Sequence, residues 1–236
     1  MAIKSWSHSS VTMFENCKFA AWLKHDQRIP EPEKPLRPGQ LELPNNRGTR
    51  IHQGAEDYVV GSISQQLPEM RHFGAEFEHL HRLYSKGIVS LEGEWAVDLN
   101  WVPTAWKLGW HRSKLDAIVF PNEWTAIVID YKTGRRFGNE IKHAEQTQLY
   151  GLNTILRYPK IEEVHTELWY LDQDELASAT FTRTQLLRLK TSWDRRGKAM
   201  TTATEFPPNP NIHSCKWCRY GTNDGGSGHC KVGAWR

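Results

Sequence analysis

The sequence contains no long hydrophobic run. None of its 236 residues belongs to a stretch approaching the roughly 20 consecutive apolar residues that a membrane-spanning helix needs. The segment Met1–Ser7 likewise has no apolar core of the kind found in secretory signals. We therefore expect a cytoplasmic protein with no membrane association.

Cysteine is scarce as well. The chain has four, at positions Cys17, Cys215, Cys218 and Cys230. Structural disulfides are disfavoured in a reducing compartment. Three of the four thiols lie close together near the C-terminal end, which favours a metal or cluster site instead.

Neither sign of charge dominates. There are 30 Lys and Arg residues against 27 Asp and Glu residues, a formal net charge of +3. This mildly basic balance permits a polyanionic partner without requiring one. With 39% hydrophobic and 24% charged residues, the composition is that of an ordinary globular protein and excludes disorder as a description of the whole chain.

The length fits a single domain over residues 1–236. Hydrophobic periodicity and breaker residues predict a set of helices and strands. We expect helices over 9–25, 47–60, 69–86, 139–157 and 183–200, and strands over 89–99, 107–120, 125–131 and 163–171. The proline-rich segment 26–46 and the Cys-rich segment 207–236 should be irregular. This order predicts an α/β (α+β) fold with a central mixed sheet flanked by helices.

The strands 107–120 and 125–131 should form a hairpin around the turn Pro121–Trp124. To within one residue of register, this pairing places Asp116 opposite Asp130, and strand alternation places Lys132 on the same face as Asp130. Two carboxylates this close repel unless a cation lies between them. Hard oxygen ligands suit Mg²⁺ or Mn²⁺. Taken alone, Asp-x-Lys equally fits a surface ion pair at the end of a strand.

Two helices carry further polar candidates. Gln146 and Tyr150 are four residues apart and fall off the apolar face expected for helix 139–157. They are either solvated or turned toward a ligand. His52 lies at the margin of the apolar face of helix 47–60, where it is either a core histidine or a metal ligand.

These pieces occur in the order of a known family. The matching stretches are the four cysteines and the segments Arg47–His52, Lys114–Asp116, Val128–Gly134 and Gln146–Tyr150. Together they resemble the RecB-like exonuclease family of the PD-(D/E)XK superfamily. They are most similar to its cysteine-bearing branch, which includes the AddB nuclease domain and the CRISPR-associated iron–sulfur exonucleases. The resemblance implies one PD-(D/E)XK nuclease domain over nearly the whole chain.

The resemblance also implies a role for each site residue. His52, Asp116 and Asp130 would be metal ligands together with the backbone carbonyl of Tyr131. Lys132 would orient or help deprotonate the attacking water. The DNA strand would be contacted by Gln146 and Tyr150.

For the cysteines, the resemblance implies a [4Fe–4S] cluster on Cys17, Cys215, Cys218 and Cys230 that joins the N-terminal helix to the tail. Spacing alone leaves a Zn²⁺ site open. Eleven residues separate Cys218 from Cys230, more than the family would lead one to expect. This insert contains His229, a competing ligand.

We therefore expect a metal-dependent deoxyribonuclease that hydrolyses DNA phosphodiester bonds as an exonuclease on single-stranded ends. The alternative is a non-catalytic DNA-binding or scaffolding relative that retains the fold. Opposed Asp116 and Asp130 argue against this alternative, because a pure binding protein has no reason to oppose two carboxylates. The resemblance leaves room for a helicase or recombination partner.

Overall fold

The structure is a computed structural model that describes residues 3–33, 36, 39–134, 136–223 and 225–232. The chain divides into two compact units. One unit is Pro44–Thr191, and the other combines Met1–Leu43 with Ser192–Arg236. Each unit is described by itself.

A six-stranded mixed sheet forms the centre of the unit Pro44–Thr191 in the described residues. Its order is β2-β1-β3-β4-β5-β6. The strands are β1 (Val89–Val97), β2 (Pro103–Thr104), β3 (His111–Val119), β4 (Thr125–Lys132), β5 (Glu163–Tyr170) and β6 (Glu175–Thr182). Neighbouring described strands pair antiparallel except β4 and β5, which are parallel. The parallel pair requires a crossover, and helix α5 (Glu140–Arg157) provides it.

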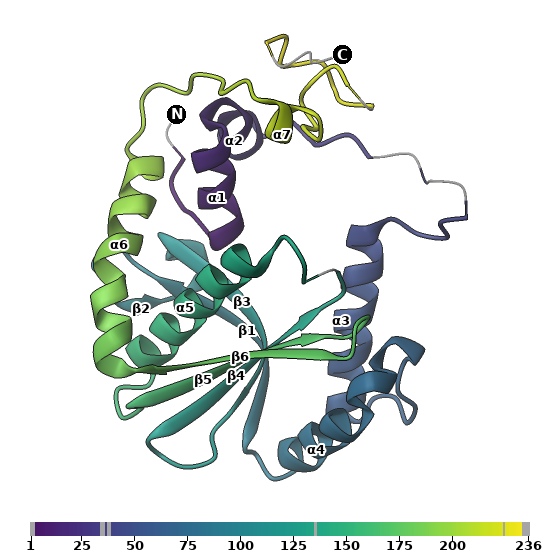
Figure 1. Cartoon of the computed structure of the whole chain (residues 1–236). Helices are drawn as coiled ribbons and strands as arrows, with labels where there is room; N and C mark the ends of the chain where they lie inside the picture. The colour runs from purple at the N-terminus through teal and green to yellow at the C-terminus, as the bar shows by residue number, and fades with distance from the viewer. Residues whose placement is uncertain (1–2, 34–35, 37–38, 135, 224, 233–236) are drawn as a thin grey trace. The chain divides into compact units, whose positions relative to one another are not determined.

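Helices pack against both faces of this sheet, as Figure 1 shows for α5 on one side and α3 and α4 on the other. The helical segments of the unit are α3 (Pro44–Val60), η1 (Pro68–Phe73), α4 (Gly74–Tyr84), η2 (Trp106–Leu108) and α5. The long helix α6 (Arg183–Thr201) begins in this unit and continues beyond its last residue, Thr191. One core cluster joins α3 and α4 to strand residues such as Ala117, Ile129 and Trp169. The expected mixed sheet flanked by helices is confirmed.

The hairpin of β3 and β4 has the register that the sequence predicts. The observed partners are Ala117 with Ile129, Ile118 with Val128 and Val119 with Ile127. Continued by one residue, this register opposes Asp116 and Asp130. The two acids therefore lie where the hairpin ladder ends.

Several predicted boundaries were wrong. Strand β6 was not expected, because its small and polar residues alternate too weakly to signal a strand, and it lies at the sheet edge. The segment 107–120 begins with a 3₁₀ turn, and the strand starts only at His111. The expected helix 69–86 is divided into η1 and α4 at Gly74.

The other unit contains α1 (His8–Asn16), α2 (Lys18–His25) and α7 (Ile212–Cys215). The single helix expected over 9–25 is broken at Cys17, whose backbone is extended with φ −159° and ψ 107°. At this break, the Cys17 side chain packs in the same hydrophobic cluster as Cys218 and Cys230. Tertiary packing thus overrides the local helical pattern.

Membrane-spanning segments are absent from the described part of the chain, since none of its helices is both long and apolar enough to cross a bilayer.

Candidate active site

One cleft in the unit Pro44–Thr191 collects the hydrolytic candidates. It has a volume of about 870 Å³. All seven residues that the sequence singles out for this site line it: His52, Asp116, Asp130, Tyr131, Lys132, Gln146 and Tyr150. They come from α3, the middle of β3, the end of β4, and α5.

Asp116 is held from two sides. Its Oδ1 lies 2.7 Å from the Nδ1 of His52 on α3. Its Oδ2 accepts a hydrogen bond of 2.6 Å from the backbone N–H of Tyr131. The second bond joins the middle of β3 to the end of β4, just beyond the hairpin ladder. Both oxygens of Asp116 therefore have fixed directions.

Asp130 belongs to a second set of contacts. Its Oδ1 accepts a bond of 2.7 Å from the hydroxyl of Tyr150, and its Oδ2 lies 2.6 Å from Lys132 Nζ. Lys132 Nζ also donates to Gln146 Oε1 at 2.8 Å. Tyr150 is only 3% exposed, so this part of the site is largely closed to water.

The environment changes the ionisation of the His52 and Asp116 pair. Burial raises the pKa of Asp116; the hydrogen bond from His52 opposes this shift, and the charge of Asp130 adds to it. Burial by itself would lower the pKa of His52, but the hydrogen bond and charge of Asp116 outweigh it and raise that pKa. Two carboxylates and an imidazole thus share a site that favours bound positive charge.

Burial also shifts the pKa of Tyr150, the hydrogen-bond partner of Asp130. It raises the pKa of Tyr150 well above its usual value, and the charges of Asp130 and Asp116 act in the same direction. The phenol therefore stays protonated and acts as a hydrogen-bond donor toward Asp130.

The donor chemistry fits a hard divalent cation. Asp130 Oδ2 is buried, and apart from the ion pair with Lys132 Nζ at 2.6 Å it accepts no hydrogen bond from the described residues. Carboxylate oxygens with spare lone pairs are the ligands that Mg²⁺ and Mn²⁺ prefer. Over the described ranges, no group of three His, Cys, Asp or Glu side chains is already arranged around a common metal position.

The N-terminal part of α3 is fixed against the loop after β4. Arg47 forms a bidentate ion pair with Asp172, with N–O distances of 2.8 and 2.7 Å, and also donates to the Thr133 carbonyl. These contacts explain why Arg47 precedes His52 in the motif.

Sequence reasoning missed several residues that line the same cleft, among them Asn139, Lys142 and His143. His143 Nδ1 lies 2.7 Å from the hydroxyl of Tyr170. Burial, together with the charge of Lys132, lowers the pKa of His143 to about 4. Its position three residues before Gln146, nearly one helical turn, is the signal that could have identified it.

The cysteines lie in the other unit and are free thiols. Cys17, Cys218 and Cys230 share a cluster with Leu23 and Tyr220. Burial raises the pKa of Cys218, and the neighbouring Cys17 and Cys230 contribute.

Cys215 and the insert before Cys230 have their own contacts. Cys215 Sγ accepts a bond of 3.4 Å from the backbone N–H of Asn211. The insert folds back through backbone bonds, including Ser227 N–H to the Arg219 carbonyl at 2.9 Å. His229 is exposed and contacts Ser227 at 2.7 Å.

Comparisons with known proteins show what this chain is similar to. The family model described as "PD-(D/E)XK nuclease superfamily" matches residues 5–222. Among solved structures, one described as "Crystal structure of SSO0001" is 17% identical, covers 92% of this chain and 84% of its own, and has a TM-score of 0.41. No curated protein matches. Because the family model covers most of the sequence, this chain belongs to the PD-(D/E)XK nuclease superfamily.

Proposed function

We propose that this protein is a metal-dependent deoxyribonuclease that hydrolyses DNA phosphodiester bonds, acting as an exonuclease on single-stranded ends. The observation that carries the proposal is the pair Asp116 and Asp130 in one cleft with Lys132. Membership of a nuclease superfamily supports phosphodiester hydrolysis. The preference for single-stranded ends depends on the resemblance to RecB-like exonucleases.

Asp116, Asp130 and His52, with the backbone carbonyl of Tyr131, would hold Mg²⁺ or Mn²⁺. Such an ion, when bound, lowers the pKa of a water molecule and neutralises charge on the phosphate. The contribution of the protein is to keep the two carboxylates apart and directed. The Tyr131 N–H fixes Asp116, and the Tyr150 hydroxyl fixes Asp130.

Lys132 would position the attacking water and stabilise negative charge that develops on the phosphate. Gln146 and Asp130 hold its ammonium group at the cleft, where only 16% of the side chain is exposed. Gln146 and Tyr150 would contact the DNA strand. The buried hydroxyl of Tyr150 would in addition hold Asp130 in place.

We place the chain in the cysteine-bearing branch of the family, as one nuclease domain over 1–236 with a Cys-rich segment at 207–236. Cys17, Cys215, Cys218 and Cys230 would bind a [4Fe–4S] cluster, with Zn²⁺ as the alternative. Cys17, Cys218 and Cys230 belong to one group of packed hydrophobic side chains, and this proximity supports a common site. The exposed His229, bonded to Ser227, is a poorer candidate for the fourth ligand than Cys215.

A non-catalytic DNA-binding relative is the second candidate. A binding surface would gain nothing from burying two acids whose charges repel each other and raise the pKa of Asp116. The arrangement therefore favours catalysis.

The test is cleavage of end-labelled DNA by the purified full-length chain. Substrates are linear single-stranded, linear double-stranded and covalently closed circular single-stranded DNA, each with Mg²⁺, Mn²⁺ or a chelator. We expect linear single strands to be degraded only with a metal ion, and circles to resist. Rapid cutting of circles would indicate an endonuclease. Binding without any cleavage under all metal conditions would favour the scaffolding relative.

A further inference from the structure

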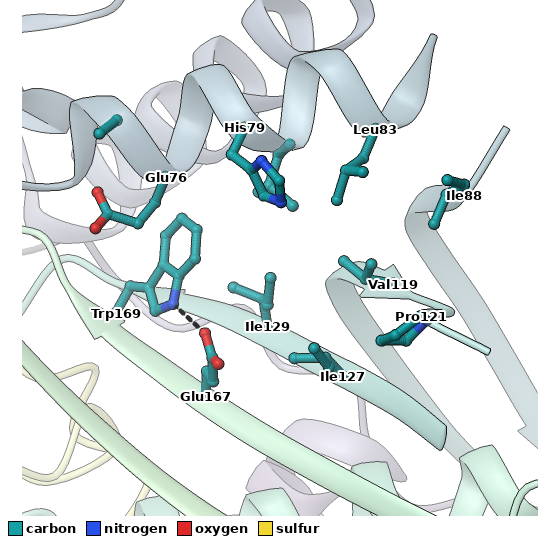
Figure 2. A pocket seen from close by; sticks show the side chains of 12 residues that line it. Glu76, His79, Leu83, Ile88, Val119, Pro121, Ile127, Ile129, Glu167 and Trp169 are labelled. Atoms are coloured by element: carbon teal, nitrogen blue, oxygen red, sulfur yellow. Dashed lines mark hydrogen bonds between the residues drawn. The ribbon is translucent and has the colours of Figure 1, made fainter. Parts of the chain in front are cut away.

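A second cavity lies on the sheet face opposite the hydrolytic residues. It has a volume of about 660 Å³, within the range of small-molecule sites, and is formed by α4 and strands β3 to β5 (Figure 2). Its apolar lining includes Leu80, Leu83, Ile88, Val119, Ile127 and Ile129. Ile129 directly precedes Asp130, and alternation along β4 turns the two side chains to opposite faces.

The cavity has two chemically different ends. Figure 2 shows Glu76, Trp169 and Glu167 together at one end and Leu83, Ile88 and Val119 at the other. The strand register places Trp169 and Val119 at different heights along β4. Trp169 pairs with Tyr131, whereas Val119 pairs with Ile127, four residues earlier on that strand. Along α4, Leu83 follows Glu76 by seven residues, which is about 10 Å of helix.

Of the two carboxylates at the polar end, Glu76 is exposed to solvent. Among the described residues, neither Glu76 nor Glu167 forms an ion pair with a lysine or arginine. Glu167 is half-buried, and its Oε2 accepts a bond of 2.8 Å from Trp169 Nε1. The Trp169 ring is itself stacked on Phe73 at a centroid distance of 5.2 Å. Glu167 is therefore held at the cavity end.

We propose that this cavity binds an elongated apolar molecule that ends in a protonated amine. The aliphatic part occupies the end formed by Leu83, Ile88 and Val119, where burial of apolar surface is favourable. The ammonium group of the ligand lies between Glu76 and Glu167, whose carboxylates accept charge-assisted hydrogen bonds from it. A fatty acid of the same length is disfavoured, because its carboxylate would face two others of like charge.

Calorimetric titration of the full-length chain with three eight-carbon probes tests this assignment. The probes are octylammonium, octan-1-ol and octanoate, which share the chain and differ in head-group charge. We expect octylammonium to bind at least about tenfold more tightly than octan-1-ol, with octanoate the weakest. Equal binding of octanoate and octylammonium, or binding of no probe, would overturn the proposal. Binding of a lysine- and leucine-containing peptide but not of octylammonium would equally overturn it.

Substitutions locate the binding. Glu76→Gln and Glu167→Gln should each weaken the binding of octylammonium about tenfold and leave the binding of octan-1-ol unchanged. At position 167, the glutamine side chain still accepts the hydrogen bond from Trp169 Nε1. The matched control is Glu78→Gln on the same helix, because Glu78 is not among the residues that line the cavity and pairs with Arg82 at 3.6 Å. An equal loss in all three variants would contradict the site. None of these experiments depends on nuclease activity, so their failure and a failure of the proposed function are separate results.

Discussion

The hydroxyl of Tyr150 donates to Asp130 Oδ1 at 2.7 Å and closes a ring of four side chains. Gln146 Nε2 donates to the same hydroxyl at 2.5 Å, and Gln146 Oε1 accepts from Lys132 Nζ. Lys132 Nζ returns to Asp130 Oδ2 at 2.6 Å. Lys132, two residues from Asp130 on β4, and the pair Gln146 and Tyr150, four residues apart on α5, thus orient the Asp130 carboxylate.

Tyr150→Phe should slow DNA cleavage by about tenfold or more. The substitution removes the donor to Asp130 Oδ1 without changing the packing shape, so the carboxylate loses its direction. It should lower the free energy of unfolding by about 1 to 3 kcal/mol, because a buried acceptor is left without its donor. Single-turnover cleavage and urea unfolding measure the two effects. Tyr158→Phe, at the C-terminal cap of the same helix, is the control and should change neither. Equal rates for wild type and Tyr150→Phe would exclude the orienting role.

Asp116→Asn and Asp130→Asn should each abolish metal-dependent cleavage while DNA binding survives. Each removes an anionic oxygen ligand but keeps the side-chain size. Cleavage and binding are measured on the same preparations. Glu94→Gln is the control, since the exposed Glu94 pairs with Lys114 at 2.7 Å and is not among the residues that line the cleft. Undiminished cleavage by either aspartate variant would show that the site assignment is wrong.

Lys132→Met should reduce turnover by roughly 10²-fold or more and leave metal affinity largely intact, as expected for a positioned acid–base or electrostatic group. Metal titration by calorimetry beside single-turnover kinetics separates the effects. The control is Lys160→Met, which removes an exposed lysine paired with Glu123 at 3.1 Å. If Lys132→Met lost metal binding but not the chemical step, Lys132 would have a different role.

His143→Gln should make folding less sensitive to acid. The pKa of His143 falls from 6.5 in the unfolded chain to about 4 in the folded protein, so the unfolded chain binds more protons between these values. The stability linked to this group is therefore present above pH 6.5 and is lost as the pH falls toward 4. Urea unfolding at pH 7 and pH 5 should show a smaller acid loss for the variant than for wild type.

His229→Gln is the matched control for this titration, because His229 is exposed. It should lose as much stability as wild type between the two pH values. If the free energy of unfolding of His143→Gln decreased as much as that of wild type between pH 7 and pH 5, the His143 imidazole would not contribute to the acid sensitivity. The groups shifted in the opposite direction, His52 and Asp116, are present in every variant and cancel from the comparison.

Cys218→Ser should destabilise the protein more than it alters the hydrolytic chemistry. A site shared by Cys17 and Cys218 closes most of the chain into one loop, and such constraints stabilise by several kcal/mol in the cross-link model. Metal or cluster binding is also coupled to folding. Thermal unfolding and cleavage by the folded fraction are the measurements. A variant as stable as wild type but catalytically dead would contradict this structural role.

The bound group is identified on the wild-type protein purified without oxygen. A [4Fe–4S] cluster predicts a brown protein that contains iron and sulfide. A colourless protein with stoichiometric zinc would replace the cluster by a zinc site and leave the structural role unchanged.

The sequence alone determined the features that depend on local periodicity. Alternation in two neighbouring strands and a turn at Pro121–Trp124 are sufficient to oppose Asp116 and Asp130, because a hairpin turn sets the register of its strands. The mixed sheet follows from the order of helices and strands in the same way. Each of these inferences uses residues within one hairpin or one short connection.

Only the tertiary structure decided how those residues are oriented. Tyr150 lies off the expected apolar face of its helix, yet it is buried because β4 brings Asp130 against it. The break at Cys17 interrupts a pattern that is locally helical, since distant Cys218 and Cys230 complete its environment. Edge strand β6 exists because β5 offers a row of backbone partners, which no periodicity in β6 itself reveals. In each case the deciding free energy comes from contacts between residues far apart in sequence, and such contacts leave no local pattern.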